Sequence, residues 1–130
     1  KELARVTKPG GSVLVRLPAL PVLKGPHDAY VHGVRRYTAP ELDGKLARAG
    51  LTPIRITYAN SILLPMIFIS RQIGNLMVSF GQEPTSDVNP TVGIVNQLLT
   101  HILNLEASWI GGGRNFPAGV SLFGIARKPQ

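Results

Sequence analysis

The chain contains no cysteine, few acidic residues and no long hydrophobic run. Without cysteine it can form neither disulfides nor thiolate metal sites, and a reducing compartment is permitted. Its most apolar stretch, Ile62 to Ile69, is too short to span a bilayer and contains Pro65. The opening residues, Lys1 to Arg5, lack the apolar core of a signal peptide. These absences predict a cytoplasmic protein.

Charge of either sign is also sparse, because charged residues make up 16% of the 130-residue chain, whereas about a quarter is usual. The hydrophobic content of 44% supports a real core, and the length fits one domain over residues 1–130. A small domain with so few charges leaves apolar surface that a partner would cover. We therefore expect a homo-oligomer, most simply a two-fold dimer.

The charge that is present is mostly basic, with 14 Lys and Arg against 7 Asp and Glu, a net charge of +7. Such a balance is compatible with nucleic-acid binding. The basic residues are scattered, however, and none alternate with aromatics as a stacking surface requires. Nucleic acid is therefore a disfavoured partner, and so is a membrane surface, because Arg71 is the sole charge between Ile62 and Phe80.

The first half of the chain is divided by clear turn and capping signals. Residues 1–7 resemble the end of a helix, and the turn Lys8-Pro9-Gly10-Gly11 precedes an apolar strand over 12–17 that we expect to be covered on both faces. A long loop over 18–38 follows, and loops of this length tend to be functional. Thr38 and Glu41 have the spacing of a capping box, which predicts a helix ending at Gly50.

The second half alternates strand, two helices and strand. Ile54, Ile56 and Tyr58 alternate with polar residues, which predicts a half-buried strand over 51–59. Two apolar helices are expected over 62–77 and 89–110, with His101 on a surface and Trp109 in the core. They form a helical insertion at 62–110 that either covers an apolar acceptor or a membrane surface, or packs as a dimer or core-covering hairpin. The last strand is expected over 119–127.

Four short motifs in order resemble a known family. They are Lys8-Pro9-Gly10-Gly11, Leu17-Pro18-Ala19, the run HDAYVHGVRRY over 27–37, and LARAGL over 46–51, with ARKP near the end. This order is similar to the C-terminal half of class I S-adenosylmethionine-dependent methyltransferases, closest to bacterial enzymes of the type 11 or type 12 sort. The resemblance implies an α/β, partial Rossmann-like fold. Its small mixed sheet would hold one parallel-type strand plus an antiparallel pair, with three to four helices.

The sequence departs from this family where the methyl donor binds. Family members hold the cofactor on a Gly-rich loop after the first strand and an acidic residue after the second, and neither precedes Lys1. The cluster Gly111-Gly112-Gly113 follows a helix and is better interpreted as a helix stop. The resemblance thus implies transfer of a methyl group to an unknown small-molecule acceptor by a longer form that binds S-adenosylmethionine. The present chain would bind no cofactor and be inactive alone; the alternative is a non-catalytic binding or assembly module.

The candidate site residues lie in the loop over 18–38, which leaves the first strand at its carboxyl end, where ligands bind in open α/β sheets. His27 and Asp28 could orient or deprotonate the acceptor as catalytic residues. Alternatively, Asp28 pairs with Arg35 or Arg36 and only holds the loop. No metal site is expected, because the spacing of these groups suits none. The candidate substrate-binding residues are Tyr30, His32, Arg35, Arg36 and Tyr37, and for the tyrosines packing is an equal alternative.

Overall fold

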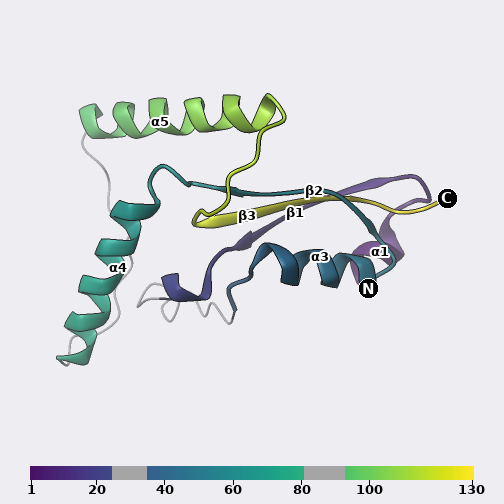
Figure 1. Cartoon of the computed structure of the whole chain (residues 1–130), viewed down its shortest axis with the longest axis horizontal. Coiled ribbons are helices and arrows are strands. Elements are labelled where there is room, and N and C mark those ends of the chain that lie inside the picture. Colours follow the sequence, from purple (N-terminus) through teal and green to yellow (C-terminus); the bar gives the residue numbers. More distant parts are fainter. Residues whose placement is uncertain (25–34, 81–92) are drawn as a thin grey trace.

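The computed structural model describes residues 1–24, 35–80 and 93–130, which form helices on both sides of one sheet (Figure 1). The boundaries agree with the sequence expectations to within a few residues. In chain order the elements are α1 (Glu2–Val6), β1 (Ser12–Pro18), the 3-10 helix η1 (Pro21–Leu23), α3 (Ala39–Arg48), β2 (Thr52–Ala59), α4 (Leu64–Ser79), α5 (Gly93–Gly111) and β3 (Ser121–Arg127).

The three strands have the order β1-β3-β2, and β3 is antiparallel to both neighbours. The expected antiparallel pairing of the last two strands is confirmed. The expected mixed sheet is wrong for the described residues, because β3 lies between the two earlier strands and gives β1 an antiparallel neighbour. β1 and β2 still run parallel to each other, on opposite sides of β3. The carboxyl ends of β1 and β2 therefore lie at the same end of the sheet, where Pro18, Ser121 and Ala59 form one row across the three strands.

One face of the sheet packs against α3 and carries the hydrophobic core. Leu42 and Leu46 of α3 are buried there against Leu122 and Ala126 of β3. The helix begins as predicted: the Thr38 N–H donates to the Glu41 carboxylate at 2.9 Å in a capping box. The Tyr58 hydroxyl accepts the next free N–H of this helix, from Ala39, at 3.0 Å. Helix α3 is therefore fixed to the sheet by both packing and capping.

The opposite face is only partly covered, and three burial expectations are wrong. β1 was expected to be covered on both faces, but Leu14 is 66% exposed because no described element lies over its outer side. Ile54 is exposed because a bulge between Pro53 and Arg55 shifts the register of β2 against β3. Trp109 is 46% exposed instead of central to the core, because its ring packs at the end of α5 against Phe116 and the Arg114 guanidinium.

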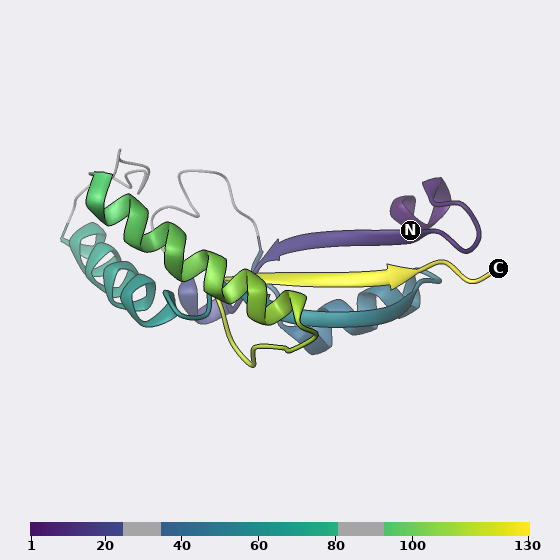
Figure 2. The same cartoon turned by 90° about the horizontal axis from the view of Figure 1, so that it is seen from above.

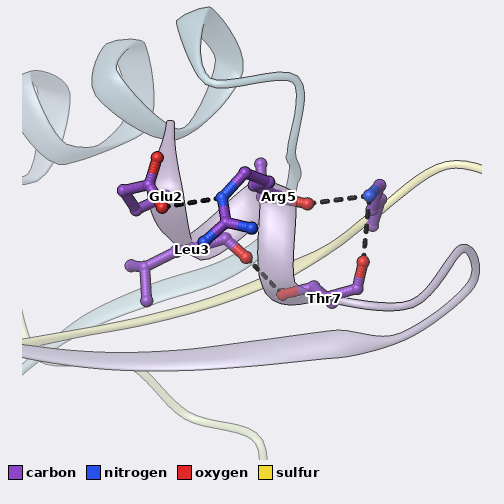
Figure 3. Close-up of polar contacts among 6 residues, drawn as sticks. Glu2, Leu3, Arg5 and Thr7 are labelled. Atoms are coloured by element: carbon purple, nitrogen blue, oxygen red, sulfur yellow. Dashed lines mark hydrogen bonds and ion pairs between the residues drawn. The ribbon is translucent and has the colours of Figure 1, made fainter.

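The first turn and the C-terminal tail are joined by hydrogen bonds. The Gly10 N–H donates to the Lys128 carbonyl, and the Lys128 N–H donates to the Gly11 carbonyl, each at 2.9 Å. Lys128 Nζ also donates to the carbonyls of Ala4 (2.8 Å) and Thr7 (2.9 Å) at the C-terminal end of α1, whose polar contacts Figure 3 shows. A cation is favourable at this end of a helix. Two motifs from opposite ends of the sequence thus form one structural unit.

Helices α4 and α5 lie away from α3. Figures 1 and 2 show α5 crossing obliquely over the face of the sheet opposite α3, and α4 extending from the end of β2. As predicted, α5 ends at the glycine cluster, where Gly113 has a φ of 84°. His101 is exposed, as expected. Within the described ranges no helix is long and apolar enough to cross a membrane.

Candidate functional site

The structure describes three of the seven residues that the sequence singled out. His27, Asp28, Tyr30 and His32 lie outside the described residues. The other three, Arg35, Arg36 and Tyr37, form the segment that leads into α3.

This segment closes the loop that follows β1. Tyr37 forms a parallel bridge with Ala19, in which the Tyr37 N–H donates to the Pro18 carbonyl at 2.9 Å and the Leu20 N–H donates to the Tyr37 carbonyl at 3.0 Å. Arg36 donates to the Ala19 carbonyl at 2.9 Å. The two ends of the predicted loop are thus held together at the carboxyl end of β1.

Arg35 has a partner that the sequence analysis did not consider. Its guanidinium forms an ion pair with Glu41 at 2.7 Å and lies 5.2 Å from the centroid of the Tyr37 ring. The Thr38 N–H first, and then the Arg35 guanidinium, lower the pKa of Glu41 below its ordinary value. Arg35 therefore helps to fix the start of α3.

A second site, which the sequence analysis missed, lies on the face of the sheet opposite α3. Neighbouring residues on the three strands form two rows across this face: Arg16, Phe123 and Thr57, then Leu14, Ile125 and Arg55. Helix α5 covers the β2 side of these rows with Leu103, Ala107 and Ile110 and leaves the β1 side open. Together these residues line a groove of about 420 Å³, inside the range of roughly 300–1,000 Å³ for small-molecule sites.

Glu106 fixes the middle of α5 beside this groove. It is 3% exposed, and its carboxylate accepts the backbone N–H groups of Asn60, Ser61 (2.8 Å) and Ile62 (3.2 Å) just after β2. Asn60 has a φ of 56°, which turns these consecutive N–H groups toward one acceptor. Both carboxylate oxygens are thereby occupied.

Arg55 fixes the C-terminal end of the same helix. Its guanidinium donates to the Ile110 carbonyl at 2.9 Å, the Arg114 carbonyl at 2.6 Å and Asn115 Oδ1 at 2.8 Å. All three acceptors are uncharged. The charge of Arg55 is therefore left without a carboxylate in the described structure, although its hydrogen bonds are satisfied.

Arg16 is the groove's second cation. It is exposed, lies 5.6 Å from the centroid of the Phe123 ring and is 3.4 Å from Ser121 Oγ. The ion pairs seen across the described ranges are Glu2–Arg5 and Arg35–Glu41, so neither guanidinium of the groove is in one. The fixed charges of the groove are two guanidiniums against one carboxylate that is already bound by backbone N–H groups.

This arrangement suits some ligands and excludes others. An apolar floor with an accessible guanidinium can hold an apolar molecule that carries an anionic group. S-adenosylmethionine fits poorly, because its sulfonium is cationic and the groove has an excess of positive charge. No group of three potential metal-binding side chains occurs in the part of the chain that the structure describes.

The sequence contained one usable signal for this site. Glu106 is the sole charged residue of an otherwise apolar and neutral helix, over 93–111, and a lone carboxylate in such a helix is usually satisfied by a specific partner. Arg16 and Arg55 gave no comparable signal, because a charge on an alternating strand is normally solvated. That they lie together follows from the strand order.

Comparison of the chain with protein-family models, with characterised proteins and with solved structures finds no match. The family resemblance of the four motifs therefore stays a prediction.

Proposed function

We propose that this chain is the acceptor-side part of an S-adenosylmethionine-dependent methyltransferase, acting on a small molecule within a longer form of the protein. The observation that carries the proposal is that the carboxyl ends of β1 and β2 lie at the same end of the sheet, on either side of β3. The loop whose sequence includes His27 and Asp28 starts and finishes at this end of the sheet, because Ala19 and Tyr37, near its two ends, form a bridge. Ligands of open α/β sheets bind at this position.

The free edge of β1 also supports the proposal. Among the described residues, no strand pairs with β1 on the side away from β3. A further strand at this edge, running parallel to β1, would give the mixed, Rossmann-like sheet that the resemblance implies. It would also protect an edge that is open to association with other chains.

We expect no site for the methyl donor among the described residues. The groove has the wrong charge for the sulfonium, and no glycine-rich turn follows β1 or β2. Binding of S-adenosylmethionine is therefore assigned to a longer form, and the present chain alone is inactive. In that form, His27 and Asp28 would orient or deprotonate the acceptor, and Tyr30, His32 and the Arg35–Tyr37 segment would contact it.

The test is methyl transfer by the longest natural form of the protein, supplied with S-adenosylmethionine and a small-molecule extract of its source cells. We expect release of S-adenosylhomocysteine that depends on the extract. Replacement of Asp28 by Asn should lower this turnover by about a hundredfold, the effect of losing a general base, with an unchanged melting temperature. Absence of extract-dependent release would refute the methyltransferase proposal.

The second candidate is a binding or assembly module without catalysis, which self-associates as a homodimer. The observation that favours it is the exposed apolar surface of α4 and α5, where Ile69, Ile94 and Leu105 are each at least 60% exposed, together with Phe80 directly after α4. Light scattering after size exclusion separates the two candidates when combined with the transfer assay. A stable dimer without methyl transfer supports the module, and a 14.0 kDa monomer argues against it.

A further inference from the structure

We propose that the groove between α5 and the sheet binds an apolar organic acid, whose anionic group lies at Arg16 and whose apolar body lies on Phe123 and Ile125. This inference concerns binding and stands independently of methyl transfer. If the proposed function holds as well, this ligand class is the chemical class of the methyl acceptor.

The charge of the ligand follows from the hydrogen bonds around the groove. Glu106 is 3% exposed and accepts three backbone N–H groups, so its carboxylate is hardly accessible to a cationic ligand, and its one negative charge leaves the two guanidiniums of the groove in excess. The Arg55 guanidinium is bound only by neutral acceptors, so its positive charge still acts on the groove. A ligand anion therefore enters a site with a net positive charge and needs no further counter-ion.

The position of the anion follows from exposure. Arg55 is half-buried and its donors are engaged, whereas Arg16 is exposed and has one long hydrogen bond, 3.4 Å to Ser121 Oγ. A guanidinium presents five N–H donors in a planar fork that fits a carboxylate. Arg16 consequently has donors to offer a ligand, and Arg55 supplies attraction at longer range.

The apolar body of the ligand follows from the floor of the groove. Phe123 and Ile125 lie side by side on β3, and Leu14 extends the floor beyond Ile125 onto β1. Leu14 is 66% and Ile125 38% exposed, so apolar surface is open to solvent next to a cation. Covering this surface is favourable at about 25 cal/mol per Å², which rewards an apolar acid over a small hydrophilic anion.

The experiment compares two probes of the same shape, naphthaleneacetate and its uncharged amide, by NMR amide shifts of the chain. We expect naphthaleneacetate to shift Phe123, Ile125 and Thr57 and to bind about tenfold more tightly than the amide, the effect of a hydrogen-bonded charge. Arg16→Gln should reduce the affinity for the acid to that for the amide. Equal affinity of the acid and the amide for the unmodified chain would overturn the proposal.

Two further variants make the test specific. Arg48→Gln removes an exposed charge of α3, on the other face of the sheet, and should leave both affinities unchanged. Ala107→Trp places a large side chain in the groove from α5 and should abolish binding of both probes. A loss at Arg48→Gln equal to that at Arg16→Gln would show a general charge effect and contradict the proposal, and so would binding that survives Ala107→Trp.

Discussion

At the scale of single residues, the close approach of β2 and β3 depends on a glycine. A Cβ on Gly119 would lie 2.8 Å from Ser61 Oγ and closer still to the Ala59 carbonyl oxygen. The Ala59 carbonyl belongs to the backbone of β2, so it cannot shift without disturbing the sheet. Gly119 therefore allows the chain to enter β3 beside the end of β2, where Glu106 binds.

Replacement of Gly119 by Ala should destabilise the chain by about 1–3 kcal/mol, the usual cost of overpacking. Gly111→Ala is the matched control, because a Cβ there has no neighbour within 4 Å and alanine is favoured in helices by up to about 1 kcal/mol. Denaturant unfolding measures both changes. A Gly119→Ala chain as stable as the unmodified one would show that the backbone adapts at this point.

The residue scale also shows what sequence can predict. Thr38, Glu41 and Gly50 are local signals, so the limits of α3 could be predicted closely. The exposure of Ile54 could not, because it depends on a bulge that exists only in the pairing with β3. The groove could not be predicted either, because Arg16, Arg55 and Glu106 are distant in sequence and meet through the strand order.

At the scale of elements, α5 is held to the sheet mainly by polar contacts. Many of its large apolar side chains are exposed, among them Ile94, Leu98 and Leu105. Instead, Glu106 in the middle of the helix accepts hydrogen bonds from the backbone after β2. At the end of the helix, the Ile110 carbonyl accepts a hydrogen bond from the Arg55 guanidinium. The position of α5 over the groove therefore depends on these few hydrogen bonds.

Glu106→Ala should release the middle of α5 from the sheet. Three backbone N–H groups would lose their acceptor, at a cost of about 1–3 kcal/mol for each one that stays buried. We expect hydrogen exchange at the Ser61 and Ile62 amides to accelerate by about tenfold or more, the factor that 1.4 kcal/mol represents. Glu106→Gln keeps one acceptor oxygen and should give a smaller change.

The control for this prediction is Asn104→Ala, an exposed position on the same helix, which should leave exchange at Ser61 and Ile62 unchanged. Protection of these two amides that persists in Glu106→Ala would mean that other contacts hold α5 in place.

At the scale of the whole molecule, the two faces of the sheet have different roles. The face under α3 is packed with apolar side chains and supplies the stability of the fold. The opposite face carries two arginines and an open apolar floor beneath α5, and it supplies the candidate binding site.

The central claim, an acceptor-side chain without a donor site, is tested most directly by titration calorimetry of the isolated 130-residue chain with S-adenosylmethionine. The account predicts no saturable heat, because the groove repels the sulfonium and no glycine-rich turn follows β1 or β2. Saturable binding with a dissociation constant of about a micromolar, a free energy near 8 kcal/mol, would contradict it.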